Sequence, residues 1–384
     1  MSGSPPHDVL IDVLTRLPNK TLIRCACVCK SWYSLVTNPS FINTHLNANS
    51  NNNNHHLLLT RSLSADDANR VNYSLHWKND RHNYPYLRII GSCNGLVCLS
   101  DDLHGYREVL YLWNPSIRKT IALPPLRVKF QSHGLFKHSI GIGFDALNDD
   151  YKVIRIVYLY KPNNFRPLAE IDIFSLNTGT WRNISHLSLP YTTVEWAPQA
   201  YLNGAAHWLA YDGRRKDFYC LIVSFHMGDE RFGEIMVPGS FSRENVGVAK
   251  FQESLSVIQD LWSKYTSCIW VMKEYGVSDS WTKVFNIDMS VGFGSVVGFT
   301  RKGEVLLRLY TGYLVAYDPY TEQKMHLIRG STFYANDYTE SLVLFRAKFA
   351  IFTGLNESTH DHLYESSKVS SSLACLLNEV ENVD

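Results

Sequence analysis

The chain repeats one pattern five times: an apolar strand that runs into a turn with a polar residue. The copies are centred on Trp113, Leu176, Phe225, Met272 and Tyr317, at intervals of 63, 49, 47 and 45 residues. Periods of roughly 40–50 residues with about four strands each are typical of β-propeller blades. The repeat therefore predicts a mainly β fold with a propeller-like architecture, and a β-sandwich or an irregular stack of sheets is the alternative.

A second recurring unit places a tight turn before an apolar strand, as in Asn94-Gly95 and Asn203-Gly204. Both residues of an Asn-Gly pair accept the positive φ of a type I′ turn, so each pair predicts a hairpin. An aromatic residue follows repeats two to four and is expected to pack blade against blade: Trp181, Phe232 and Trp281.

Apolar segments at both ends of the β region predict how it closes. Residues 57–60 and 73–77 precede the first repeat, and residues 341–345 follow the last. Strands from the two chain ends would together complete one more blade, which removes the exposed edge of the sheet. We therefore expect about six blades within residues 57–352.

Residues 5–46 form a separate pattern that predicts a small module of three helices. Apolar residues recur at helical spacing from Val9 to Leu17, and Pro18 ends this helix because the residue before a proline is displaced from the α region. Roughly forty residues cannot bury this much apolar surface alone. The module should dock onto another protein or, as the simpler alternative, cap the following domain.

Two polar segments mark the remaining boundaries. Residues 47–56 contain six Asn and no large apolar residue. Such a segment has no apolar surface to bury that would balance the conformational entropy lost on ordering, so we expect a linker. Residues 353–384 carry six acidic residues against one lysine, together with serine runs, and are expected to be a mobile tail.

The composition excludes several classes of partner. Lys and Arg number 37 against 36 for Asp and Glu, so the chain lacks the basic footprint of nucleic-acid binding. No apolar run reaches the 18 residues that a membrane span requires. Eight cysteines in 384 residues, without a secretory pattern at the start, predict reduced thiols and a cytoplasmic or nuclear protein.

The catalytic motifs in the sequence are weak. Gly141-Ile-Gly143-Phe-Asp-Ala146 matches GxGxxA, but a turn and another strand follow it where a dinucleotide site needs a helix. His207 lies in an alternating strand and is expected to be a buried core histidine. Cys25, Cys27 and Cys29 lack a second pair at ligand spacing. We expect no catalysis, metal or cofactor, with a carbohydrate-active propeller as the enzymatic alternative.

The helical module resembles an F-box. The residues that carry the resemblance are Asp8-Val-Leu-Ile-Asp-Val-Leu-Thr-Arg-Leu-Pro18, Leu22-Ile-Arg24, Val28-Cys-Lys-Ser-Trp32, Leu35, Phe41 and His45-Leu46. The chain departs from the family at Pro5-Pro6, where members usually begin Leu-Pro, and at Cys25, which is often Phe. The resemblance implies binding to a SKP-family adaptor, and thereby to the cullin scaffold of an SCF ubiquitin ligase. The residues expected to bind the adaptor are Leu10, Ile11, Leu14, Leu17, Pro18, Leu22, Ile23, Val28, Trp32 and Leu35.

The β region resembles the F-box-associated domain of plant F-box proteins. The matching segments are 91–98, 112–119, 143–145 with 148–153, 174–181 and 340–344. Within that family the chain is similar to the S-locus F-box branch, whose members recognise S-ribonucleases in self-incompatibility. The resemblance implies a non-catalytic receptor that delivers a target protein for ubiquitination and degradation. An interaction protein that no longer assembles a ligase is the alternative. Specificity is expected in four loops: 127–138, 161–168, 190–199 and 239–247.

Overall fold

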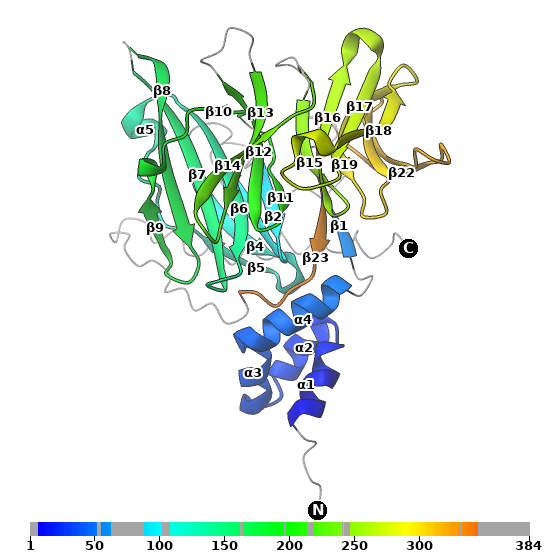
Figure 1. Ribbon diagram of the computed structural model, residues 1–384. Helices are drawn as coiled ribbons and strands as arrows, with labels where there is room; N and C mark the ends of the chain where they lie inside the picture. The colour runs from blue at the N-terminus through cyan, green and yellow to red at the C-terminus, as the bar shows by residue number, and fades with distance from the viewer. Residues whose placement is uncertain are drawn as a thin grey trace, which may run out of the picture.

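A group of helices at the N-terminus lies below a ring of β-sheets in the computed structural model of the chain (Figure 1). The structure describes residues 7–51, 55–62, 88–101, 108–161, 164–195, 197–212, 219–239, 241, 246–330 and 332–344. The expected tail and the segment 73–77 lie outside these residues. No helix in the described part of the chain is long and apolar enough to cross a membrane.

The ring consists of five antiparallel sheets within the described residues. The first sheet holds β2 (Arg88–Cys93), β3 (Leu96–Asp101), β4 (Val109–Asn114) and β5 (Lys119–Ala122). The second holds β6 (Lys137–Asp145), β7 (Asp150–Lys161), β8 (Asn164–Ser175) and β9 (Thr180–Asn183). The third holds β12 (Ala205–Asp212), β13 (Tyr219–His226) and β14 (Arg231–Met236), and its inner strand is in two pieces, β10 (Thr192–Thr193) and β11 (Ala200–Leu202).

The last two sheets have four strands each. The fourth holds β15 (Val246–Phe251), β16 (Ser254–Leu261), β17 (Thr266–Met272) and β18 (Trp281–Asp288). The fifth holds β19 (Phe293–Phe299), β20 (Val305–Leu309), β21 (Tyr313–Tyr317) and β22 (Lys324–Arg329). Short helical turns lie between strands: η1 (Pro115–Ile117), α5 (Phe130–His133), η2 (Ser185–Leu187), η3 (Trp262–Lys264) and η4 (Ser278–Ser280).

Each copy of the sequence repeat is one sheet, which confirms the propeller. The five landmark residues lie at or next to the end of the third strand of their sheets, from Trp113 in β4 to Tyr317 in β21. The prediction of six blades is wrong, because in the described residues the two chain ends form a two-stranded sheet instead of a four-stranded blade. In this two-stranded sheet, β1 (His55–Ser62) pairs with β23 (Thr332–Thr339), and His55 is opposite Thr339.

The two-stranded sheet closes the ring, as expected of strands from the two chain ends. β23 contacts β19 of the fifth sheet and β2 of the first, so it fills the gap between them. Residues 341–344 contain no strand, because they turn away from the ring and run toward the helices (Figure 1).

The predicted hairpins and packing aromatics are confirmed. Asn94 and Gly95 have φ values of 46° and 80°, as a type I′ turn requires. The indole of Trp181 donates to the carbonyl oxygen of Pro124 at 3.0 Å, and the indole of Trp281 donates to that of Met236 at 2.8 Å. Each tryptophan thereby ties its blade to the end of the preceding one.

The Gly141–Gly143 motif serves packing within the ring. Both glycines lie in β6, and strand β7 follows where a dinucleotide site would have a helix. A Cβ atom on Gly141 would lie 2.3 Å from the indole of Trp208, and one on Gly143 would lie 2.7 Å from Tyr201. The two glycines therefore allow the third sheet to approach the second closely.

Four helices, one more than expected, form the N-terminal module: α1 (His7–Thr15), α2 (Asn19–Ala26), α3 (Lys30–Val36) and α4 (Pro39–Asn51). Their shared core contains Leu14, Leu22, Ala26, Val36 and Phe41. The linker expected over 47–56 is much shorter, since α4 continues to Asn51 and β1 begins at His55. The amide of Asn49 in the last turns donates to His45 at 3.3 Å and to the carbonyl oxygen of Glu340 at 3.5 Å, so tertiary contacts stabilise this polar end of the helix.

Candidate functional site

The propeller has two distinct edges. We call the edge that faces the helices the near edge; it contains the turns between strands one and two, and between strands three and four, of each sheet. The opposite edge, the far edge, contains the remaining loops. The helices contact the near edge through α2 against η1, and through a 2.8 Å hydrogen bond from the Asn43 amide to Asp149 in the β6–β7 turn.

The residues expected to bind an adaptor divide into two groups in the structure. Leu14 and Leu22 are only 2% and 0% exposed and form the core of the helices, so they support the surface from within. The other members are exposed or half-buried: Leu10, Ile11, Leu17, Pro18, Ile23, Val28, Trp32 and Leu35.

Three further exposed apolar side chains on the helices were not in the expected set: Val9, Val13 and Tyr33. Val9 and Val13 are 52% and 51% exposed, and Val28 in the α2–α3 turn is 70% exposed. The helical periodicity includes both valines, but it does not reveal which part of the apolar stripe the module buries internally. The module therefore presents apolar surface that the propeller does not cover.

A short segment after β23 joins the helices to the propeller. Leu342 is fully buried in the core of the helices, whereas the neighbouring Val343 packs in the core between the first two sheets. Ser341, also fully buried, accepts hydrogen bonds from the Asn114 amide at its carbonyl and hydroxyl oxygens, at 3.0 and 3.1 Å. We call this segment, residues 340–344, the clasp.

Tyr338 anchors the start of the clasp. Its hydroxyl lies 2.7 Å from the hydroxyl of Ser116, and burial raises its pKa well above the ordinary value. A Cβ atom on Gly95 would lie 2.2 Å from the hydroxyl of Ser341, so glycine is required for the clasp to pass this turn. The orientation of the helices relative to the propeller is thus held by buried, satisfied contacts.

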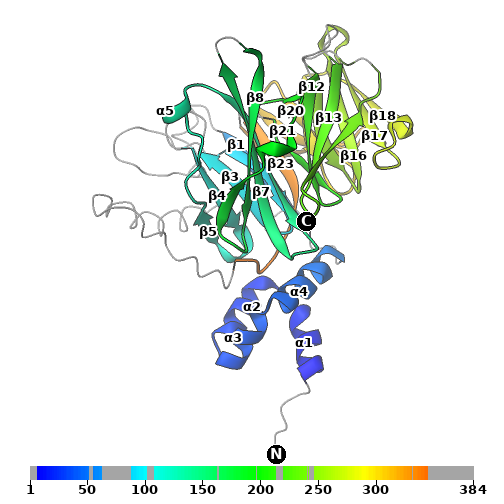
Figure 2. The ribbon, with the colours of Figure 1, turned by 60° about the vertical axis from the view of Figure 1, so that its left-hand side comes forward.

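The four loops expected to carry specificity lie mainly at the far edge, away from the helices (Figures 1 and 2). Pro198 and Gln199, at the end of the third loop, instead line a cavity at the near edge. They are described except for residues 162–163, 196, 240 and 242–245. Several exposed large apolar side chains also lie in or beside far-edge loops: Leu135, Leu168, Tyr265, Val291, Tyr310 and Tyr313. Residues 161–168 are mostly strand, because β7 ends at Lys161 and β8 begins at Asn164, and residues 192–193 form β10. The sequence named these segments, but it could not show how they are placed on the propeller.

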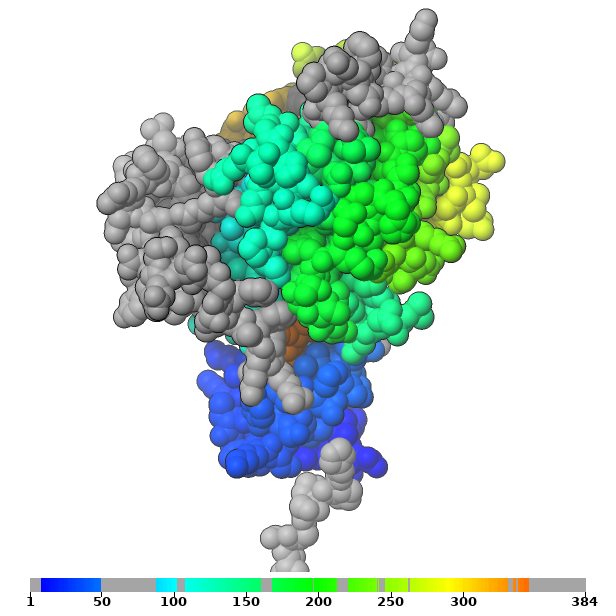
Figure 3. All heavy atoms as spheres, turned by 90° about the vertical axis from the view of Figure 1, so that its left-hand side faces the viewer, coloured from blue at the N-terminus to red at the C-terminus, as the bar shows by residue number. Residues whose placement is uncertain are grey.

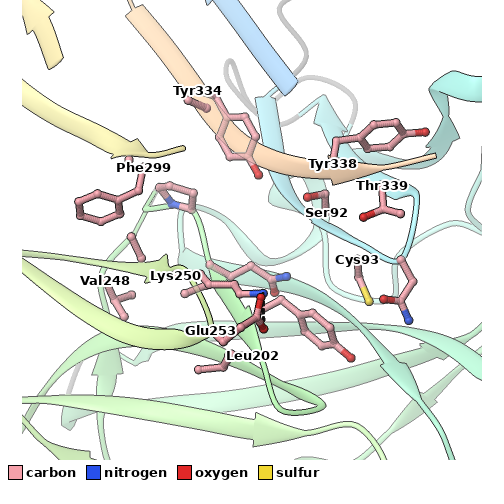
Figure 4. Close-up of a pocket in the computed structure, with 18 of the residues that line it drawn as sticks. Ser92, Cys93, Leu202, Val248, Lys250, Glu253, Phe299, Tyr334, Tyr338 and Thr339 are labelled. Carbon is pink, nitrogen blue, oxygen red and sulfur yellow. Dashed lines mark hydrogen bonds and ion pairs between the residues drawn. The ribbon is translucent and has the colours of Figure 1, made fainter. Parts of the chain in front are cut away.

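A cavity of about 270 Å³ lies between the innermost strands of the ring, beside the near-edge turns at Asn94-Gly95 and Asn203. Figure 4 shows side chains that line it. Cys93, Lys250, Phe299 and Tyr338 are among its lining residues. Burial raises the pKa of the Cys93 thiol to about 12, which keeps it protonated and unreactive. Lys250 is paired with Glu253 at 3.1 Å.

Possible catalytic groups in the propeller are engaged in structural contacts. His207 is fully buried, as expected of a core histidine; its Nδ1 donates to the Ala200 carbonyl oxygen at 3.1 Å, and its Nε2 accepts from the Tyr275 hydroxyl at 2.8 Å. Lys152 lies 2.7 Å from Asp145 and 2.9 Å from Glu230, an ion network between the second and third sheets. Over the described ranges, no group of three His, Cys, Asp or Glu side chains could hold a metal ion.

Comparison with known proteins agrees with this architecture. Residues 31–343 match the family described as the F-box associated beta propeller domain, and residues 6–44 match the F-box domain. Over 373 residues the chain is 29% identical to the Arabidopsis thaliana F-box protein At3g07870, covering 82% of this chain and 85% of that one. It is also 29% identical to F-box protein CPR1 of the same plant over 371 residues, covering 88% of each chain. The chain therefore belongs to the family of F-box proteins with an F-box-associated β-propeller domain.

Proposed function

We propose that this F-box protein is the substrate receptor of an SCF-type ubiquitin ligase. One observation carries the proposal: uncovered apolar surface on the helices and the exposed far-edge loops lie at opposite ends of one clasped molecule (Figure 2). The helices bind a SKP-family adaptor, and through it the cullin scaffold, while the propeller holds a target protein. The receptor contributes proximity rather than bond chemistry, so it is itself non-catalytic. It acts in the cytoplasm or nucleus, and its target is degraded by the proteasome.

The adaptor surface in this proposal is the uncovered part of the F-box. It combines the exposed and half-buried members of the expected set with Val9 and Val13, while Leu14 and Leu22 maintain the helices from inside. Aspartate at Val28 places a charge in the centre of an apolar contact, where it is desolvated without a partner.

Co-purification with a SKP-family adaptor tests the proposal. The unchanged chain is expected to form a stable complex, and Val28→Asp to lose it. Val291→Asp is the matched control, because Val291 is 60% exposed on the far edge of the propeller. Failure of the unchanged chain to bind the adaptor would favour an interaction protein that works outside an SCF ligase.

The resemblance to the S-locus branch supports a finer proposal, in which the target is an S-ribonuclease and the process is self-incompatibility. Immobilised S-ribonuclease should retain the chain–adaptor complex, and an unrelated ribonuclease of similar charge should not. Equal retention of the complex by both ribonucleases would contradict this target.

A further inference from the structure

The loop that joins the first sheet to the second, residues 123–136, is held at its base by buried contacts. The carbonyl oxygen of Val128 accepts from the Arg155 guanidinium at 2.7 Å, and the amide of Phe130 donates to the Glu108 carboxylate at the same distance. Leu126 and Val128 are 6% and 0% exposed. This base lies on the far edge of the propeller.

A buried ion pair holds both sides of the loop. Arg155 and Glu108 lie 3.0 Å apart, and their side chains are only 1% and 4% exposed. The guanidinium also lies 5.3 Å from the ring centre of Phe136, which stacks on Phe130 at 4.1 Å. Because removing one partner of a buried pair leaves an uncompensated charge, the arrangement keeps the residues on either side of the loop tip in one position.

The tip itself is exposed. Residues 131–135 are all exposed, and Leu135 is 90% exposed, more than any other large apolar side chain in the described part of the chain. A single exposed leucine is ordinary on a protein surface. A leucine at the tip of a fixed loop differs, because little conformational entropy is lost when a partner covers it.

Cationic side chains border Leu135. Arg127 at the base of the loop is paired with Glu170 at 2.7 Å and with Asp172 at 3.4 Å, so the lysines beside the tip carry the local positive charge. Lys129 and Lys137 flank the tip and are partly exposed, and His133 within it is exposed. The apolar tip is therefore bordered by cationic side chains, and electrostatic complementarity favours a partner with acidic groups at the corresponding positions.

We propose that Leu135 is the anchor by which the propeller holds its target, and that the target offers an apolar socket bordered by acidic residues. The proposal rests on the proposed function, since it names the site and the chemistry of the protein that the receptor delivers. The position suits this role because the tip lies at the far edge, near the top of the blue-green surface in Figure 3, with the blue helices at the opposite end.

The test compares protein abundance in plant cells that express the unchanged chain or one of three variants. Proteins that accumulate with Val28→Asp, which disables the F-box, define the set of targets. Leu135→Asp is expected to raise the abundance of the same proteins as much as Val28→Asp does. Unlike Val28→Asp, it should still co-purify with the adaptor. Leu147→Asp is the matched control, because Leu147 is 81% exposed at the near edge, in the β6–β7 turn, and it should leave their abundance unchanged.

Binding of one purified protein from that set then measures the contact. Leu135→Asp should weaken its affinity for the chain–adaptor complex by roughly tenfold or more, the effect typical of a binding hot spot. Lys129→Glu combined with Lys137→Glu should also weaken it, and Lys302→Glu at the near edge should not. Normal turnover and binding with Leu135→Asp would overturn the anchor but leave the proposed function intact. An empty target set would contradict the proposed function, and the anchor with it.

Discussion

The side-chain amide of Asn114 donates to the carbonyl oxygen of Val343 at 2.7 Å, across 229 residues of sequence. Asn114 is fully buried at the end of β4, and the same amide serves both oxygens of Ser341. One side chain of the first sheet thus holds the clasp that carries Leu342 into the F-box.

Replacing Asn114 with alanine should lower the free energy of unfolding by about 2–3 kcal/mol, because buried carbonyl groups lose their donor. Urea denaturation measures the change. Asn177→Ala is the control, since Asn177 occupies the corresponding turn of the second sheet but is exposed. An equal loss of unfolding free energy in the two variants would show that the hydrogen bonds from Asn114 to the clasp stabilise the fold no more than those of an exposed turn residue.

Leu342 couples the F-box to the propeller, so Leu342→Ala should loosen the helices. The expected cost is about 2–5 kcal/mol, as for other buried leucines, and hydrogen exchange should become faster in α2 and α4. Val343→Ala is the neighbouring control, because Val343 packs among the sheets. If both variants changed exchange in the helices equally, the assignment of the two side chains to separate cores would be wrong.

Gly141 is required by the approach of Trp208, so Gly141→Ala should destabilise the chain by about 1–3 kcal/mol through overpacking. Gly247→Ala should be neutral or stabilising, because an added Cβ atom there meets nothing within 4 Å. Thermal unfolding of the two variants checks the difference, and a stable Gly141→Ala would contradict the close packing of β6 on the third sheet.

His207 predicts a dependence of stability on pH. Burial lowers its pKa from 6.5 to about 4, so folding favours the neutral ring. Its contribution is complete above pH 6.5 and is lost as the pH falls toward 4, about 3 kcal/mol in all. His207→Gln should flatten the pH dependence of the unfolding free energy across this window relative to the unchanged chain. If the unfolding free energy of His207→Gln depended on pH as steeply as that of the unchanged chain, His207 would not be the source of this pH dependence.

The sequence correctly predicted those structural elements that depend on residues close together in the chain. Hairpins at Asn-Gly pairs follow from backbone preference, and the five sheets follow from the repeat. The number of blades was wrong because residues 341–345 are as apolar as a strand; Leu342, however, is buried by the F-box, a contact that no local pattern reveals. The linker predicted over 47–56 was too long for a similar reason, because the contact of Asn49 with Glu340 stabilises the end of α4.

The candidate site was only partly predictable. Helical spacing identified the apolar residues of the F-box, but it could not separate Leu14 and Leu22, which the helices bury, from Val28, which they expose. The far-edge loops could be named individually. Their common location, and the ion pair of Arg155 with Glu108 beneath Leu135, depend on strands that are distant in sequence.

The decisive measurement is a crystal structure of the chain bound to a SKP-family adaptor. We expect the adaptor to cover Val28 and the neighbouring apolar side chains of the F-box, Leu342 to stay in the core of the helices, and the far edge to remain open. An adaptor seated on the far-edge loops, or an F-box released from Leu342, would show that the F-box is not the adaptor surface or that the clasp does not hold it.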